Sequence, residues 1–493
     1  YGMFPRGWTL MAAARNPSPW IPWSLALGDL LAFALAVYFS RLSHAFYYGE
    51  SPLRVLASWW GSLAEVNILL FLFLASLGVL AFLLKGHYAR RKVFWDEVGD
   101  IITVFTVLLG LNAAIAFSGK WPLSRLWLFS AWLLALLLLP GLRLLQRWIF
   151  RRLGLWSRPV AIIGTGANAL EAMRAIQSDT LLGYEVRWLL SPEEIPPKPS
   201  PANASQPTVL ALGRDPLATL RTLGSPQVVL ALDNNHWQIQ QDLLRLLGLY
   251  YPNLAIAPAL RGLPLYGLEV MHFFSHEVFM LRVRDNLARP GPRLVKRVFD
   301  VLTAAGLTLL LSPLLLWIAW RIRAEDGGPV LFRQERVGRN GKPFWCLKFR
   351  SMVPDAEARL QQYLLEKPTL AAEYQHNFKL RDDPRITRIG RFLRRSSLDE
   401  LPQLFNVLRG EMSLVGPRPL LARELSRYGD NIALYTLVNP GITGLWQVSG
   451  RSETSFADRS NLDAWYVRNW TLWYDIVILL RTVRVVFRRE GAY

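Results

Sequence analysis

Four long apolar runs fill the first third of the chain, at roughly residues 20–39, 68–84, 101–117 and 123–144. Each is close to the ~20 residues that a helix needs to cross the hydrocarbon core of a bilayer. A helix satisfies its own backbone hydrogen bonds in lipid, where no water is available to do so. The pattern therefore predicts a four-helix transmembrane bundle over residues 1–152.

Basic residues give this bundle an orientation. The loop between the third and fourth runs carries only Lys120 and Arg125, whereas larger groups of basic residues follow the second and fourth runs. These groups contain Lys85, Arg90, Arg91, Lys92, Arg143, Arg147, Arg151 and Arg152. Because positively charged loops stay in the cytoplasm, we expect both ends of the bundle to lie there.

Asp29 interrupts the first apolar run. A carboxylate at the centre of a membrane helix costs about 3 kcal/mol or more unless it has a partner. We therefore expect Asp29 to face another helix or to lie near a membrane interface. A structural role is favoured over a functional one.

The pattern changes after the bundle, and it predicts a Rossmann-like α/β domain over residues 158–291. A short buried strand at 159–163 leads into the turn Gly164-Thr165-Gly166 and then a helical run. Such a glycine turn is a candidate site for nucleotide binding. However, Ala169 replaces the third glycine of the pattern, and no acidic residue ends the next strand. A nucleotide site at Gly164 and Gly166 and a plain strand-to-helix turn both stay open.

A fifth apolar run, residues 301–320, is broken by Ser312-Pro313. Proline in a helix interior removes a hydrogen bond and clashes with the preceding turn, at about 3 kcal/mol. It also pushes Ser312 away from helical geometry. A full crossing would place the basic region after Arg321 outside the cell, against the positive-inside rule. We therefore predict a re-entrant helix over about 298–321.

Composition narrows the class of partner. The chain has 493 residues, a net charge of +19 and 52% hydrophobic residues, with a mean hydropathy of +0.20. Such a basic chain suits nucleic acid, anionic lipid or phosphorylated substrates. Because its basic residues cluster beside apolar and Trp-rich segments, we expect a membrane partner and no nucleic acid. The single cysteine, Cys346, excludes an internal disulfide and a cysteine-based zinc site.

Two adjacent carboxylates, Asp399 and Glu400, lie among fixed cations in the segment 394–404. Phosphoryl transfer depends on positioning and on neutralising charge, for which this set of groups is suited. The spacing of Ser397 and Glu400 also fits a helix capping box. The two interpretations are compatible, because a helix N-terminus stabilises a carboxylate and presents free N–H groups to phosphate.

Several motifs agree with this chemistry in order and spacing. They are Gly328-Pro329-Val330-Leu331-Phe332-Arg333-Gln334-Glu335-Arg336-Val337-Gly338, Lys348-Phe349-Arg350-Ser351-Met352, Asp399-Glu400, Gly416-Pro417-Arg418-Pro419, Pro440-Gly441-Ile442-Thr443-Gly444 and Gln447-Val448-Ser449-Gly450-Arg451. Together they resemble the polyprenyl-phosphate glycosyl-1-phosphate transferases of the bacterial sugar transferase family. The resemblance implies a monotopic, α-rich catalytic domain over residues 292–493.

The resemblance also implies an activity and its site. The expected reaction moves galactose-1-phosphate from UDP-galactose to undecaprenyl phosphate and releases UMP, through a covalent intermediate on Asp399. Glu400 is then a ligand of the cofactor Mg²⁺. Planar guanidiniums grip phosphate in a bidentate way, so the arginines of the motifs are the expected clamps. The predicted phosphate-binding residues are Arg394, Arg418, Arg451, Lys348, Arg350, Gln334 and Gln447.

Other functions fit parts of the sequence. The same reaction with UDP-glucose or another UDP-sugar differs only in the sugar. An NAD-dependent, membrane-anchored nucleotide-sugar dehydratase needs a Tyr-x-x-x-Lys pair just after its glycine turn, but the matches here begin at Tyr88 and Tyr363. A non-enzymatic scaffold leaves the motifs without explanation. The resemblance further implies a homodimer in the bacterial cytoplasmic membrane, with the catalytic domain on the cytoplasmic face.

Overall fold

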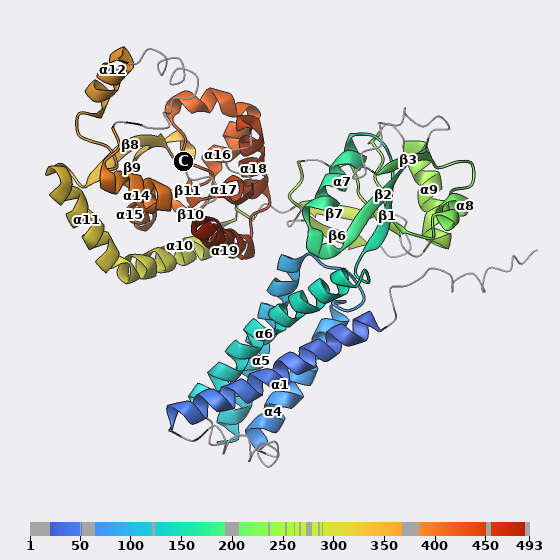
Figure 1. The fold of residues 1–493 in the computed structure, drawn as a ribbon. Coiled ribbons are helices and arrows are strands. Elements are labelled where there is room, and N and C mark those ends of the chain that lie inside the picture. The colour runs from blue at the N-terminus through green and yellow to red at the C-terminus, as the bar shows by residue number, and fades with distance from the viewer. Residues whose placement is uncertain are drawn as a thin grey trace, which may run out of the picture. The chain divides into compact units, whose positions relative to one another are not determined.

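The computed structural model describes most of the chain, in two compact units that span Tyr1–Leu260 and Arg261–Tyr493 (Figure 1). The described residues are 20–49, 51, 65–120, 124–192, 207–234, 237–251, 254–260, 262–265, 268–272, 279–283, 286–287, 289–366, 383, 385–449 and 455–488.

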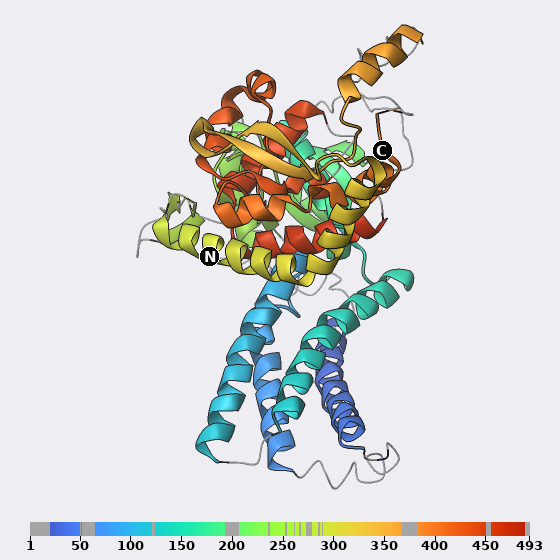
Figure 2. The ribbon, with the colours of Figure 1, turned by 90° about the vertical axis from the view of Figure 1, so that its left-hand side faces the viewer.

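The first unit begins with the predicted bundle. Four of its helices are long and apolar enough to cross a membrane, and Figure 2 shows them running side by side. The rings of Phe33, Phe71 and Trp132 pack edge-on or tilted against one another in the bundle core, while many other apolar side chains face outward, as lipid contact requires. The helices are α1 (Ile21–Tyr47), α4 (Val66–Leu84), α5 (Phe94–Ser118) and α6 (Arg125–Arg152).

Asp29 is buried against another helix, as predicted. Arg143 of α6 donates from Nε to Asp29 Oδ1 at 2.8 Å, and the Tyr88 hydroxyl donates to Oδ2 at 2.6 Å. Arg143 also donates to Glu97 Oε1 of α5 at 2.6 Å, and Arg147 pairs with the same carboxylate. These contacts join three helices through buried charges that satisfy one another.

A parallel α/β domain follows in the same unit. Its five strands have the order β3-β2-β1-β4-β5. Side chains of β1 alternate between the two faces, so Ile162 packs with Ala169 of α7 and Ile163 packs with Leu247 of α9. Both faces of the sheet are therefore covered. The elements are β1 (Arg158–Ile163), α7 (Ala167–Ser178), β2 (Tyr184–Ser191), β3 (Thr208–Ala211), α8 (Pro216–Thr222), β4 (Gln227–Leu230), α9 (Trp237–Tyr250) and β5 (Leu254–Ile256).

The described part of the second unit holds three two-stranded sheets together with its helices. Strands β8 and β9 form an antiparallel hairpin, and β10 and β11 pair in parallel. The elements in the first half of this unit after residue 289 are α10 (Pro290–Leu310), α11 (Ser312–Asp326), β8 (Leu331–Val337), β9 (Pro343–Phe349), α12 (Ala356–Glu366), α14 (Arg388–Ser396) and α15 (Gln403–Arg409). The elements in the second half of the unit are β10 (Ser413–Val415), α16 (Ile432–Leu437), β11 (Gly441–Thr443), α17 (Leu445–Ser449), α18 (Phe456–Arg468) and α19 (Leu472–Arg488).

The chain bends by 62° between α10 and α11. The residue outside helical geometry is Leu311, with φ −89° and ψ 1°, while Ser312 is the first residue of α11. The expectation that Ser312 itself departs from the helix is therefore wrong by one position. The physical reason is that Pro313 falls in the first turn of α11, where its missing N–H has no intrahelical partner to lose.

The division between the two compact units falls before residue 291, the boundary expected from the sequence. Residues from Arg261 onward, including the hairpin β6 (Leu268–His272) and β7 (Phe279–Val283), group with the second unit. Backbone contacts explain this assignment. The Leu265 N–H donates to Asn469 Oδ1 at 2.6 Å, and Asn286 Nδ2 donates to the Trp470 carbonyl at 3.2 Å. Sequence patterning cannot reveal these long-range bonds.

Candidate active site

Asp399 and Glu400 lie in a single 3₁₀ turn, Leu398–Glu400, between α14 and α15. Ser397 precedes the turn with φ +57°, in the left-handed region, and its side chain caps no helix N–H. The capping-box interpretation is therefore wrong. The sharp reversal at Ser397 instead separates two helices and presents the two carboxylates on the connecting turn.

Helix α15 is fixed against strand β9 by one buried side chain. Asn406 accepts the Leu347 N–H at 3.0 Å and donates to the Trp345 carbonyl at 2.8 Å. An amide that pairs with both groups of a strand edge sets the position of the helix as well as its distance. The turn that precedes α15 is thereby held over the same strand.

Lys348 of β9 reaches this turn. Its Nζ lies 2.7 Å from Glu400 Oε1, and both side chains are partly exposed. Arg394, near the end of α14, donates from Nε to Ser351 Oγ at 2.9 Å. Burial and the neighbouring Glu400 charge raise the pKa of Asp399 to about 6, although the Lys348 and Arg394 charges act against this rise. The structure thus gathers Asp399, Glu400, Lys348 and Arg394 in one site.

A second group of predicted residues collects around Arg418. This exposed arginine lies over the Trp446 ring, with its Cζ at 5.8 Å from the ring centroid. Gln334 accepts from Arg336 Nη2 at 2.7 Å, and Arg336 Nη1 donates to the Pro419 carbonyl at 3.0 Å. Gln334 therefore belongs to the group around Arg418, through Arg336.

Three other predicted residues have different surroundings. Arg350 is buried and pairs with Asp326, so its guanidinium joins the end of β9 to the end of α11. The Gln447 amide donates to the Ile442 carbonyl at 3.4 Å. Arg451 lies outside the described residues.

The carboxylates suit a Mg²⁺ ion that is shared with substrate. No group of three or more acidic, His or Cys side chains that could enclose a metal exists in the described part of the chain. Mg²⁺ keeps several waters and commonly binds through one or two carboxylates plus substrate phosphates. Asp399 and Glu400 fit that mode, and the Glu400 carboxylate is also paired with Lys348.

Comparison with known proteins decides the family. The model of the bacterial sugar transferases matches residues 291–489. The undecaprenyl-phosphate galactose phosphotransferase of Salmonella typhimurium is 38% identical over 474 residues, covering 95% of this chain and 97% of the relative. The chain belongs to the bacterial sugar transferase family. The predicted resemblance is confirmed.

Two further relatives are similar to this sugar transferase. The UDP-galactose-lipid carrier transferase of Erwinia amylovora is 38% identical over 478 residues, with 95% of this chain and 97% of the relative covered. The UDP-glucose:undecaprenyl-phosphate glucose-1-phosphate transferase of Caulobacter vibrioides is 43% identical over 227 residues, which are 44% of this chain and 79% of the relative. The similarity to the first two therefore extends through the bundle and the α/β domain.

In the α/β domain of the sugar transferase, the side chain of Asp233 packs against the glycine turn at Gly164 and Gly166. Asp233, which follows β4, accepts the Asn168 N–H at 3.0 Å at the start of α7. A Cβ on Gly166 would lie 1.7 Å from Asp233 Oδ2, and one on Gly164 would lie 2.4 Å from the Ala231 carbonyl oxygen. Close packing therefore explains both glycines, and a carboxylate stands where a phosphate binds in nucleotide sites.

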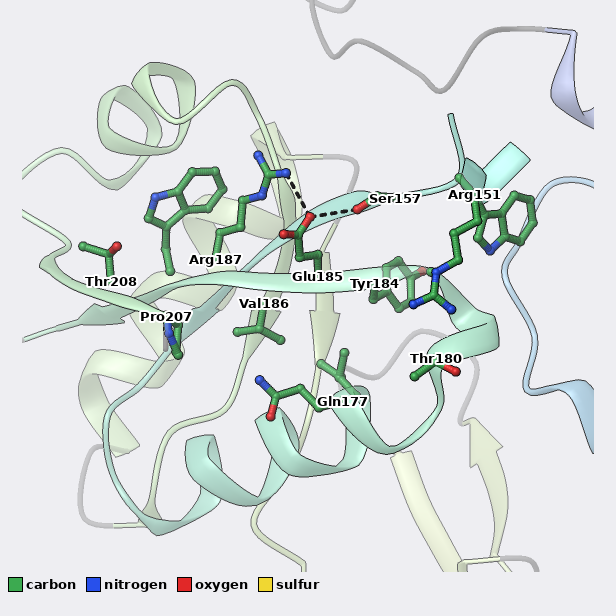
Figure 3. A pocket seen from close by; sticks show the side chains of 14 residues that line it. Arg151, Ser157, Gln177, Thr180, Tyr184, Glu185, Val186, Arg187, Pro207 and Thr208 are labelled. Atoms are coloured by element: carbon green, nitrogen blue, oxygen red, sulfur yellow. Dashed lines mark hydrogen bonds and ion pairs between the residues drawn. The ribbon is translucent and has the colours of Figure 1, made fainter. Parts of the chain in front are cut away.

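A pocket of about 670 Å³ lies at the opposite end of the same sheet. Figure 3 shows Tyr184, Glu185 and Arg187 of β2 along it, with Glu185 accepting from Arg187 at 2.9 Å and from Ser157 at 2.8 Å. Open α/β sheets bind their ligands beyond the carboxyl ends of the strands. This pocket faces the amino ends of β1 and β2, so it is not the nucleotide position that Gly164 and Gly166 predict.

Sequence reasoning missed two residues of the second group. Arg336 was part of a recognised motif without a role, and Arg459 of α18 lay outside the motifs. Arg459 places its Cζ at 4.9 Å from the centroid of the same Trp446 ring that Arg418 covers. A helical arginine carries no local signal of such a contact, because the contact depends on how α17 and α18 pack.

Proposed function

We propose that this sugar transferase moves galactose-1-phosphate from UDP-galactose to undecaprenyl phosphate and releases UMP. The observation that carries the proposal is the grouping of Asp399 and Glu400 with Lys348 and Arg394. It occurs in a chain that is 38% identical over 474 residues to a protein named for this activity. The product would be the first membrane-bound intermediate of a surface polysaccharide, such as an O-antigen, capsule or exopolysaccharide.

The reaction proceeds in two displacements. An Asp399 carboxylate oxygen attacks the β-phosphorus of UDP-galactose, and the bond from that phosphorus to the bridging oxygen breaks, so that UMP leaves with the electron pair. An oxygen of undecaprenyl phosphate then attacks the same phosphorus, and the Asp399–phosphorus bond breaks. Lys348 and Arg394 neutralise the charge on the phosphoryl oxygens in both steps.

Mg²⁺ would supply further charge neutralisation for the diphosphate when bound. Glu400 would hold it together with substrate oxygens, and Lys348 would orient the Glu400 carboxylate. Asp399 needs to be ionised to attack, and its pKa of about 6 leaves it mostly ionised at neutral pH.

The proposed membrane arrangement would bring both substrates to one surface. We propose that α10 and α11 form a re-entrant helix that enters and leaves the bilayer on the cytoplasmic face. Apolar side chains along both helices are exposed in the unit, including Leu302, Leu309, Leu316 and Trp320. The bundle would cross the bacterial cytoplasmic membrane with both ends inside, and the protein would act as a homodimer.

The α/β domain, Rossmann-like in strand order, would serve as a connector without a nucleotide. The Asp233 carboxylate at the start of α7 supports this assignment. It argues against the NAD-dependent dehydratase alternative, which would need the turn for a dinucleotide. Thermal unfolding of the protein with and without NAD tests the point, and a clear rise in the unfolding temperature with NAD would contradict it.

The covalent mechanism is tested with UDP-galactose labelled at the β-phosphate, in the presence of Mg²⁺ and the absence of lipid. The purified protein should become labelled, and Asp399→Asn should remain unlabelled. Asp430→Asn, at an exposed aspartate of the same unit, is the matched control and should label normally. Lipid product without any protein label would overturn the covalent step.

The sugar is tested by measuring UMP release across a set of UDP-sugars. UDP-galactose should give the highest kcat/KM. UDP-glucose is the second candidate, because the Caulobacter vibrioides relative is named for it. A higher kcat/KM with UDP-glucose would identify glucose-1-phosphate as the transferred group, and the proposed reaction class would stay the same.

A further inference from the structure

A like-charged pair of arginines shares one indole in the catalytic unit. The guanidinium carbons of Arg418 and Arg459 lie 5.8 and 4.9 Å from the centroid of the Trp446 ring. Arg336 is close as well, because its Nη1 donates to the carbonyl of Pro419, the residue after Arg418, at 3.0 Å, and Glu424 Oε2 lies 3.7 Å from the same nitrogen. The guanidiniums of Arg418 and Arg459 repel each other unless an anion lies between them. The arrangement thus has the electrostatics of an anion-binding site.

The scaffold holds this pair firmly. Arg418 and Trp446 follow the carboxyl ends of the parallel strands β10 and β11, so they emerge at the same edge. A Cβ on Gly444 would lie 2.4 Å from the Gly416 carbonyl oxygen, which shows how closely the two chain segments approach. Arg459 comes from α18, where Asp463, one turn further, accepts the Tyr428 hydroxyl at 2.5 Å.

This site and the Asp399 site flank the same strand. In the hairpin, Lys348 of β9 pairs with Phe332 of β8, and Cys346, two residues before Lys348, pairs with Gln334. Gln334 accepts from Arg336 at 2.7 Å, so Lys348 and Arg336 lie along the same face of the hairpin. Lys348 and Glu400 belong to the Asp399 site, whereas Arg336 belongs to the Arg418 group. One extended anion, such as a nucleoside diphosphate, can therefore contact both groups along β9.

The Asp399 site and the Arg418 group pack against different hydrophobic clusters. Leu398 and Leu401, beside Asp399, pack on Ile318 and Ile322 of the membrane-proximal helix α11. Phe456, which precedes Arg459 on α18, packs instead in a core with Val337. Among the described residues, that second core contains none from α10 or α11. The lipid phosphate would reach Asp399 from the α11 side, which leaves the Arg418 group to the soluble substrate.

We propose that Arg459, together with Arg418 beside the same Trp446 ring, binds the nucleoside monophosphate part of the UDP-sugar and holds it as the leaving group. The inference rests on the proposed transfer from a UDP-sugar. It assigns to Arg459 a binding role that the recognised motifs do not give it. It also separates recognition of the nucleotide from recognition of the lipid phosphate within one catalytic unit.

The first measurement is the binding of UMP to the full-length protein by calorimetry. Loss of a charge-assisted hydrogen bond to phosphate weakens binding by about 10- to 100-fold, so the Kd for UMP should rise by that factor in Arg459→Gln. Arg459→Lys keeps the charge but loses the planar fork, and its Kd should rise less. Arg468→Gln, on the same helix, is the control and should bind UMP as the wild type does.

The second measurement isolates lipid transfer. Protein that already carries the phosphosugar on Asp399 is mixed with undecaprenyl phosphate, and the rate of lipid product formation should be equal in Arg459→Gln and the wild type. Unchanged UMP affinity in Arg459→Gln and Arg459→Lys would overturn the inference, as would a loss confined to the lipid step. A wild type that binds UMP but releases none from UDP-galactose would instead overturn the proposed function.

Discussion

Lys348 Nζ lies 2.7 Å from Glu400 Oε1, and this contact joins strand β9 to the turn that carries the proposed nucleophile. The two residues are far apart in the sequence and meet because Asn406 docks α15 on β9. Lys348 therefore supports the site in two ways. It orients Glu400, and it adds a positive charge that opposes the rise in the Asp399 pKa.

Lys348→Met should lower kcat/KM for UDP-galactose by about 100- to 1,000-fold, because removing one preorganised donor to a developing anion costs about 3–4 kcal/mol. UMP release is the measurement. Lys342→Met, at an exposed lysine of the β8–β9 turn, should change the rate little. Equal rates in Lys348→Met and the wild type would remove Lys348 from the mechanism.

The raised pKa of Asp399 predicts a pH dependence of activity. Since the carboxylate must be ionised to attack phosphorus, label incorporation at Asp399 should fall as the pH drops through about 6. The early rate of labelling from UDP-galactose, without lipid, follows this step alone. A rate that stays constant down to pH 4.5 would show that ionisation of Asp399 does not limit the attack.

The same shift predicts that Asp399→Asn stabilises the fold at neutral pH. The pKa is about 6 in the folded protein and 3.8 in its unperturbed state. The folded state therefore binds the Asp399 proton more tightly than the unfolded state does. The resulting contribution to the free energy of unfolding is full below pH 4 and is lost as the pH rises to 6. For a half-buried group the gain in Asp399→Asn should be about 1–3 kcal/mol at pH 7.5. Unfolding temperatures at pH 7.5 and pH 4 should show the gain only at the higher pH.

Asn406→Leu should destabilise the catalytic unit by about 2–4 kcal/mol, because it leaves the buried Leu347 N–H and Trp345 carbonyl without their partner. Activity should fall with it, since α15 positions the Asp399 turn. Thermal unfolding and UMP release check both effects. Gln361→Leu, on an exposed face of α12, provides the comparison and should leave both unchanged.

Arg143→Met should disrupt the bundle. The change leaves Asp29 and Glu97 buried without their shared partner, and breaking a buried pair in this way costs about 3–5 kcal/mol. Adding Asp29→Asn should restore part of the loss, because it removes one of the uncompensated charges. The unfolding temperature in lipid nanodiscs is the measurement, with the exposed Arg152→Met as control. If Arg143→Met alone were as stable as the wild type, the charge network would not be needed for the stability of the bundle.

Elements that depend on local composition could be predicted from the order of the residues alone. Apolar runs of spanning length predicted the four bundle helices, since lipid demands both the length and the self-contained hydrogen bonding. Pro313 predicted the break between α10 and α11, because its ring and missing N–H act within one helical turn. The adjacent Asp399 and Glu400 were likewise visible as a pair.

The groups that surround those residues depend on tertiary packing. Lys348 faces Glu400, Arg459 shares Trp446 with Arg418, and Asp233 fills the turn at Gly166. Each contact joins segments that are distant in the chain, so it depends on how helices and strands pack. Local sequence gave Ser397 the spacing of a helix cap, and packing instead made it the sharp reversal that presents the two carboxylates.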